Sequence, residues 1–138
     1  EPALNLFGQP LALCCSQPLT GFYRDGYCQT GPQDTGTHTV CAQVTKEFLS
    51  FSLSRGNDLI TPNLFYGFGG LKPGDFWCLC ISRWLEAYRA EVAPKIKLEA
   101  CHQKCLDYVK LDVLEAYAHE KILAYTDRYI YGVMRHSR

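Results

Sequence analysis

The sequence lacks a surplus of charge of either sign and lacks any long apolar run. Its 138 residues include 14 Lys and Arg and 14 Asp and Glu, so the net charge is zero. Nucleic-acid binding needs a surplus of cations to contact the phosphate backbone, so the composition argues against a nucleic-acid-binding protein. No apolar run approaches the roughly 20 residues of a membrane-spanning helix, so no direct membrane span is expected.

Internal repeats, disordered linkers and phosphate-binding loops are missing too. No stretch recurs along the chain, and no long run of like charge marks a disordered segment. The glycine-rich segment 67–70 lacks the Gly-Lys-Ser/Thr ending and the strand-to-helix setting of a phosphate loop. A chain of this length corresponds to one domain, which buries roughly two thirds of its unfolded surface without needing covalent cross-links.

Cysteine, by contrast, is frequent. The chain has eight, at Cys14, Cys15, Cys28, Cys41, Cys78, Cys80, Cys101 and Cys105. An even number fits disulfides, a metal site, or buried thiols that act as small apolar residues. Because the domain is large enough to fold without cross-links, and cysteine makes up only about 6% of it, we expect reduced thiols and an intracellular, reducing compartment.

The first residues bear on the same choice. The chain begins at Glu1-Pro2 without a methionine, which is compatible with a removed targeting peptide. A secretory signal would favour disulfides, whereas a transit peptide for a mitochondrion or plastid would favour reduced thiols or bound metal. The thiols are therefore left open between free, disulfide-bonded and metal-bound forms.

Hydrophobic periodicity in the first half predicts short elements between long loops. Residues 1–38 are rich in turn-forming residues and are expected to form an ordered loop with short strands. Alternation over 40–44 predicts a strand, and Thr45 is the expected N-cap of a helix that ends near Gly56. Residues 61–75 are a second loop, whose apolar side chains are expected to be buried.

The second half is predicted to be richer in helix. Apolar residues recur at helical spacing over 81–92, which predicts an amphipathic helix that ends before Pro94. We expect an edge strand over 95–99, a short helix over 100–108, and a helix capped by Asp112 that runs to about residue 131. The fold class predicted is α+β, a single small domain with a short sheet, three to four helices and long ordered loops.

Four motifs resemble an uncharacterised family of small proteins from bacteria and plants, domain-of-unknown-function family 2237. They are PLTGFYRDGYCQTGPQDTGTHTVCA (18–42), EFLSFSLSRGNDLITP (47–62), GFGGLKPGDFWCLCISRW (67–84) and VAPKIKLEACH (92–102). The resemblance covers roughly residues 5–118, and it implies a cysteine-containing domain over 1–118 and a C-terminal helical extension over 119–138. It implies no established activity. Cys15, Cys101 and Cys105 depart from the family pattern, so they are poor candidates for shared chemistry.

Two short ligand pairs make zinc a candidate cofactor. A zinc ion takes four thiolate or imidazole ligands, commonly from two such pairs, and the chain has His38-x-x-Cys41 and Cys78-x-Cys80. The two thiols of the second pair face one side if 77–80 is a strand and diverge if it is a helix. The alternative is packed or locally paired thiols without a metal. The candidate ligands are Cys28, His38, Cys41, Cys78 and Cys80, with Cys14 as a spare.

Nucleophilic thiol chemistry is a second hypothesis. A nucleophilic cysteine needs a neighbouring histidine or a helix N-terminus to stabilise its thiolate. Cys41 lies near His38 in the sequence, and Cys80 precedes a predicted helix. The competing interpretation is that His38 is a turn residue that hydrogen-bonds to the backbone.

Two glycine turns concentrate charged and amide groups. Their candidate polar site consists of Arg24, Asp25, Arg55, Asn57 and Asp58. Loops often carry binding residues. The alternative is structural, because Asp and Asn cap turns through their own side chains.

The tail 119–138 carries the residue types that protein interfaces favour, namely Tyr125, Arg128, Tyr129 and Tyr131. An isolated helix is marginal in water and needs a surface to pack on. We expect the tail to bury Tyr125 and Tyr129 against a protein partner, although the same tyrosines would also suit packing on their own domain.

The function predicted from these observations is a non-catalytic small intracellular domain, an accessory subunit of a larger assembly, with structural thiols or a structural zinc site. The alternative is a thiol- or metal-dependent enzyme that acts on a small molecule. A cleft with a solvent-reachable His38 or cysteine would favour the enzyme. A closed four-ligand site would favour the accessory subunit.

Overall fold

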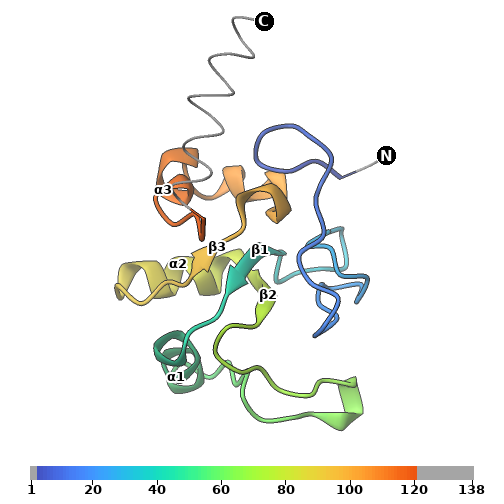
Figure 1. The fold of residues 1–138 in the computed structure, drawn as a ribbon, viewed down its shortest axis with the longest axis vertical. Coiled ribbons are helices and arrows are strands. Elements are labelled where there is room, and N and C mark those ends of the chain that lie inside the picture. The colour runs from blue at the N-terminus through green and yellow to red at the C-terminus, as the bar shows by residue number, and fades with distance from the viewer. Residues whose placement is uncertain (1–2, 121–138) are drawn as a thin grey trace, which may run out of the picture.

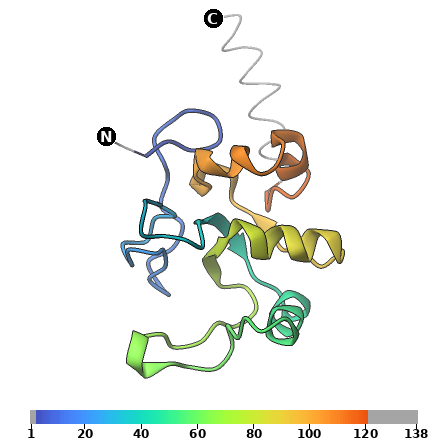
Figure 2. The ribbon, with the colours of Figure 1, turned by 180° about the vertical axis from the view of Figure 1, so that it is seen from behind.

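The computed structural model describes residues 3–120, and three short strands form its centre (Figures 1 and 2). Strand β1 (His38–Gln43) lies between β2 (Phe76–Cys80) and β3 (Lys95–Ile96) and is antiparallel to both. The helices are α1 (Lys46–Ser54), α2 (Ile81–Arg89) and α3 (Leu111–Glu115), joined by the 3-10 turns Leu64–Tyr66, Leu98–Ala100 and Gln103–Asp107. This confirms the α+β class.

The first strand and helix form for the reasons that the sequence indicated. The Thr45 hydroxyl accepts a hydrogen bond from the backbone N–H of Phe48 (3.0 Å), which caps α1. Gly56 follows the helix with φ of 86°, and its N–H donates to Leu53. Strand β1 differs from the prediction in one respect, because residues 39–42 are all buried and do not alternate. Both faces are covered, since β1 contacts α2 as well as the 3-10 turns before α3.

The C-terminal part is less helical than predicted. Residues 95–99 form only a two-residue strand, and 100–108 forms 3-10 turns in place of an α-helix. Asp112 lies in the first turn of α3 and does not cap it, because Lys110 occupies the N-cap position. Within the described residues α3 ends at Glu115, where the backbone turns to pair with β3 and the N–H of Ile96 donates to Tyr117. Residues 116–120 are turns and a bridge, and the predicted helix from 121 to about 131 lies outside the described residues.

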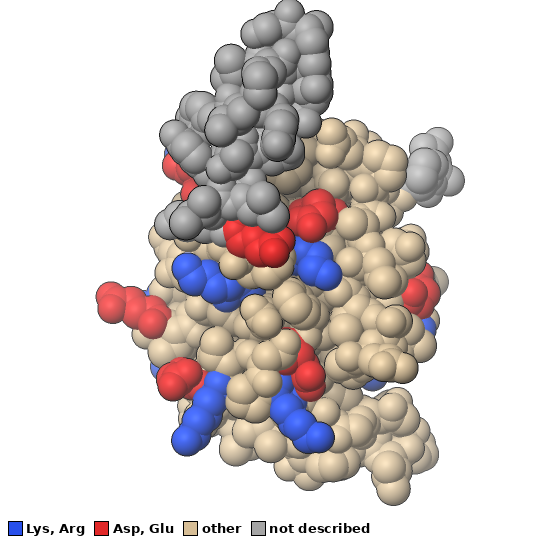
Figure 3. Space-filling model, viewed as in Figure 1, with Lys and Arg blue, Asp and Glu red and all other residues tan. Residues whose placement is uncertain are grey.

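Residues 60–70 form a loop that projects from the domain at the lower right of Figure 1. The prediction that its apolar side chains are buried was wrong for three of them, since Leu64, Phe65 and Tyr66 are 88%, 89% and 68% exposed. Their 3-10 turn is short and lies at the tip of the loop, out of reach of the core. Elsewhere on the face in Figure 3, acidic and basic side chains are interspersed, as zero net charge would suggest. No helix among residues 3–120 is long and apolar enough to cross a membrane.

Candidate functional site

The antiparallel register of β1 and β2 brings the two predicted ligand pairs face to face. His38 is the cross-strand partner of Cys80, and Cys41 is the partner of Cys78. A register irregularity lies between His38 and Val40, at the end of the ladder where the histidine emerges from the sheet. The four side chains nevertheless divide into two separate groups, one around His38 and one around buried sulfur atoms.

The first group is a contact chain of Cys80, His38 and Asp34. The Sγ of Cys80 lies 3.2 Å from Nε2 of His38, and Nδ1 of the same ring lies 2.6 Å from Oδ1 of Asp34. Asp34 has a fully buried side chain, whereas the His38 side chain is 33% exposed. A thiol, an imidazole and a buried carboxylate in this order form the arrangement by which proteins activate a nucleophilic cysteine.

Asp34 is held in place by a tight turn that precedes β1. Its Oδ2 accepts hydrogen bonds from the Thr30 hydroxyl (3.0 Å) and from the backbone N–H of His38 (2.8 Å). The carboxylate therefore binds both the main chain and the ring of the same histidine, four residues further on. This double contact fixes the orientation of the imidazole before β1 begins.

Glycine at position 36 makes room for the contact between Cys80 and His38. A Cβ atom on Gly36 would lie 2.9 Å from Sγ of Cys80 and 2.9 Å from Cε1 of His38. Any larger residue would therefore displace the pair. Cys80 is also the last residue of β2 and the N-cap residue of α2, with no side chain capping the helix. The partial positive charge of the helix N-terminus faces the cysteine and favours an anion there.

The electrostatics of the chain favour a charged histidine. The hydrogen bond to Cys80 is the main cause that raises the pKa of His38 to about 9; burial opposes it, and the contact with Asp34 adds to it. For Asp34, burial alone raises the pKa, but the hydrogen bonds from the His38 backbone, the His38 ring and Thr30 outweigh burial and hold the pKa below its ordinary value. At neutral pH the imidazole is therefore an imidazolium held between the Asp34 carboxylate and the Cys80 sulfur.

A pH titration tests this assignment. We expect the Cε1 proton of His38 to titrate near pH 9 in NMR spectra, and the midpoint to fall toward 6.5 in Cys80→Ala, because the largest cause of the shift is removed. The folded-state pKa is raised, so the histidine's contribution to stability is complete below pH 6.5 and is lost as pH rises through about 9. An unchanged midpoint in Cys80→Ala would contradict the contact.

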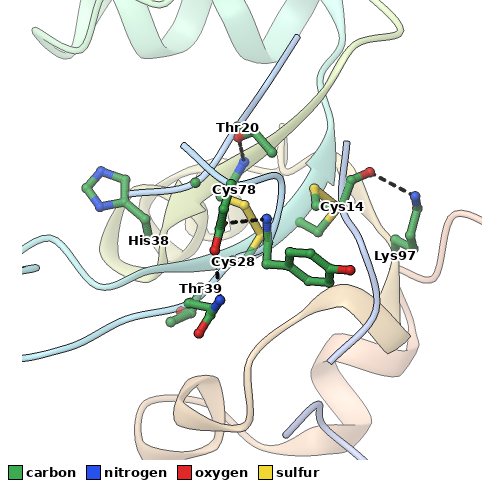
Figure 4. The surroundings of a disulfide bond; sticks show 12 residues. Cys14, Thr20, Cys28, His38, Thr39, Cys78 and Lys97 are labelled. Atoms are coloured by element: carbon green, nitrogen blue, oxygen red, sulfur yellow. Dashed lines mark hydrogen bonds between the residues drawn. A yellow bond between two sulfur atoms is a disulfide. The ribbon is translucent and has the colours of Figure 1, made fainter. Parts of the chain in front are cut away.

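The second group is a buried cluster of four sulfur atoms. Cys14 is bonded to Cys41 and Cys28 to Cys78, so both disulfides tie the N-terminal loop to the sheet. The sulfur atoms of Cys14, Cys28 and Cys78 lie within 4.8 Å of one another. Figure 4 shows this cluster with the His38 ring pointing away from it. The backbone N–H of Cys78 donates to the Thr20 hydroxyl (2.8 Å), and Nζ of Lys97 donates to the carbonyl of Cys14 (2.9 Å).

The candidate metal ligands predicted from the sequence are thus not one site. Cys28, Cys41 and Cys78 belong to the sulfur cluster, whereas His38 and Cys80 contact each other outside it. Strand geometry does put Cys78 and Cys80 on one side, but they are two positions apart with Leu79 between them, and each contacts a different partner. Cys14, a spare in the sequence, is a full member of the cluster.

The remaining cysteines stay apart from both groups, as expected for Cys101 and Cys105. Both are buried free thiols, and burial raises the pKa of Cys101 well above its ordinary value and that of Cys105 to about 11. Cys105 donates to the Thr39 carbonyl (3.4 Å). Such thiols are small core residues. Cys15 is free and partly exposed.

A pocket of about 750 Å³ adjoins the contact chain, and His38 lines it. Of the five polar loop candidates, Arg24 and Asp58 also line this pocket. The other three serve the local structure. Asp25 accepts from the backbone of Tyr27 (3.0 Å), Arg55 pairs with Glu86 (3.5 Å), and the carbonyl of Asn57 accepts from Ser52 (2.7 Å).

Sequence reasoning missed Asp34, which was not among the candidates. The available signal was an aspartate four residues before the histidine in a glycine-flanked turn, TGPQDTGTH. The predicted interface residues Tyr125, Arg128, Tyr129 and Tyr131 lie outside the described residues.

Comparison with known proteins yields a family. Residues 4–118 match the profile of one family, DUF2237, which is described as "Uncharacterized protein conserved in bacteria". That range contains Asp34, His38, Cys80 and all four cysteines of the sulfur cluster. A search of curated proteins found no match.

Proposed function

The chain belongs to the DUF2237 family, and from the site that its matched residues form we propose that it is a thiol-dependent enzyme acting on a small molecule by acyl transfer. The observation that carries the proposal is the contact chain Cys80–His38–Asp34, with distances of 3.2 Å and 2.6 Å. Cys80 is the nucleophile, His38 the acid and base, and Asp34 a positioning residue.

The steps follow from the contacts of the site and from the charged His38. The Cys80 thiolate attacks the carbonyl carbon of the substrate, and a carbon–sulfur bond forms. The bond to the leaving group breaks, and the His38 imidazolium donates its proton to that group. Water then attacks the thioester while neutral His38 accepts a proton from it, which releases the acid and restores the thiolate–imidazolium pair. Asp34 keeps the ring oriented and stabilises its positive charge throughout.

Alkylation by iodoacetamide tests the proposal, with Cys15 as a matched partly exposed thiol in the same chain. We expect Cys80 to react at pH 7 at least about tenfold faster than Cys15, because only Cys80 has an imidazolium and a helix N-terminus beside it. His38→Asn should remove this advantage and leave Cys15 unchanged, as measured by mass spectrometry of tryptic peptides. Equal rates at the two cysteines, or an unaffected Cys80 in His38→Asn, would refute the proposal.

The sulfur cluster is our candidate for the zinc site predicted from the sequence. Three of its sulfur atoms lie within 4.8 Å of one another, and a dithiol reductant that cleaved both disulfides would leave four thiols, whose protons a zinc ion displaces. Elemental analysis and a thiol count without reductant decide between the states. Eight thiols and one zinc support the metal site, whereas four thiols and no zinc support the disulfides.

The two disulfides favour an oxidising environment over the reducing compartment expected from composition.

An accessory role is the second candidate function. The tail residues Tyr125 and Tyr129 support it, because tyrosine is a residue type that protein interfaces favour. Truncation after Ala118 separates the two functions. If the truncated protein loses a co-purifying protein but keeps the reactivity of Cys80, the result supports a partner-binding extension over 119–138. If the truncated protein does not fold, the result contradicts it.

A further inference from the structure

The pocket beside His38 has walls of aromatic side chains. Phe22 from the N-terminal loop, Tyr66 and Phe68 from the projecting loop, and Trp77 from β2 line its volume of about 750 Å³. Pockets of this size hold small organic molecules, and their apolar walls take up flat apolar groups. The two loops lie on the same side of the molecule in both ribbon views (Figures 1 and 2), and the projecting loop carries no charge on the face in Figure 3.

Arg24 supplies a cation to this pocket and has no acidic partner among the described residues. Its guanidinium lies over the ring of Trp77, 5.1 Å from the centroid, and its Nη1 donates to the carbonyl of Gly21 (3.1 Å). These two contacts hold the guanidinium against the pocket wall. One of its five N–H groups is used, so the others remain available as a fork for an anionic oxygen.

The one carboxylate of the pocket is engaged by its own turn. Oδ1 of Asp58 accepts hydrogen bonds from the backbone N–H groups of Ile60 (2.9 Å) and Thr61 (3.0 Å). Contacts with the Thr61 side chain and with these two N–H groups hold the pKa of Asp58 below its ordinary value. Asp58 thus shapes the loop, whereas Arg24 and the His38 imidazolium face the pocket as positive groups.

We propose that this pocket binds a small compound that combines a flat apolar group with a carboxylate, the carboxylate pairing with Arg24 and the apolar group lying among Phe22, Phe68 and Trp77. A bidentate guanidinium–carboxylate pair over an aromatic ring gives both affinity and orientation. A compound of this kind that also carries an ester or amide carbonyl is assigned as the substrate of Cys80 on the strength of the proposed function, because His38 lines the pocket and contacts the thiol. The carboxylate then serves for binding, and the ester or amide supplies the acyl and leaving groups.

The test uses phenylacetate, its neutral analogue phenylacetamide and the cation 2-phenylethylamine in ¹⁵N-resolved NMR titrations. The protein carries Cys80→Ser, so that binding is measured without thiol chemistry. We expect phenylacetate to bind most tightly and to shift the indole N–H of Trp77, while that of the fully buried Trp84 stays unchanged. Arg24→Gln should weaken phenylacetate binding about tenfold or more and leave phenylacetamide unaffected. Lys72→Gln, which removes an exposed cation outside the pocket lining, is the matched control.

Several results would overturn the inference. They are equal affinity for phenylacetate and phenylacetamide, tighter binding of the amine, no binding, or equal effects of Arg24→Gln and Lys72→Gln. Because the titration does not depend on Cys80 reactivity, its outcome is separate from that of the alkylation experiment. Selective binding together with an unreactive Cys80 would keep the ligand class and remove the proposed function.

Discussion

Replacing Asp34 by asparagine is expected to slow acylation of Cys80 by about 10²- to 10⁴-fold, the range that positioned acid–base groups contribute. The carboxylate accepts from Nδ1 of His38 at 2.6 Å and from the backbone N–H of the same residue at 2.8 Å. An asparagine keeps one acceptor oxygen but turns a donor toward Nδ1. The ring then stays neutral with its proton on Nε2, so the thiolate–imidazolium pair with Cys80 does not form.

The measurement is release of 4-nitrophenolate from 4-nitrophenyl acetate in a single turnover, with the acyl group located by mass spectrometry. Asp25→Asn is the matched control, because Asp25 is an exposed carboxylate whose Oδ1 accepts only from the turn backbone of Tyr27 (3.0 Å) and whose Oδ2 accepts from Gln29 (2.8 Å). We expect Asp25→Asn to react like the parent protein. If Asp34→Asn and Asp25→Asn acylate equally fast while both stay folded, Asp34 has no role in the chemistry.

Removing the Cys28–Cys78 disulfide is expected to lower the free energy of unfolding by about 4 kcal/mol. The cysteines are separated by 50 positions, and closing a loop of that length restricts the unfolded chain by roughly this amount. The Cys14–Cys41 disulfide, with a separation of 27, contributes about 3.5 kcal/mol on the same argument. The two loops overlap in the sequence, so their contributions are not additive.

Urea denaturation of Cys28→Ala/Cys78→Ala measures the loss. The matched control is Cys101→Ala/Cys105→Ala, which also removes two buried sulfur atoms but breaks no cross-link. For that control we expect about 1–3 kcal/mol from lost packing alone. Equal losses in the two double variants would show that the cluster is not cross-linked. The parent protein would then titrate with eight thiols and not with the four that two disulfides leave.

The local elements followed from local chemistry. Thr45 and Gly56 mark the ends of α1, because a side-chain cap and a left-handed glycine depend only on neighbouring residues. The pattern over 81–92 predicted α2 because helical spacing is a property of the segment itself. The predicted lengths of the strand and helices over 95–120 were wrong, because pairing of Ile96 with residues 117–119 ends α3 within the described chain. Such pairing joins residues that are distant in the sequence, and no local pattern signals it.

The length and composition of this protein predicted one domain without net charge, its hydrophobic periodicity predicted α+β elements, and its motifs indicated His38 and four cysteines as candidates for its chemistry, with Cys14 as a spare. Only the tertiary structure decided how those residues divide between the contact chain around His38 and the buried sulfur cluster. The register of β1 and β2 sets His38 opposite Cys80, and the N-terminal loop brings Cys14 and Cys28 to the strand cysteines. A one-residue slip of that register would turn every side chain to the other face, and spacing within a strand does not specify its pairing. The turn before β1 places the Asp34 carboxylate against the His38 ring. For this reason the third member of the site could be recognised only from the tertiary structure.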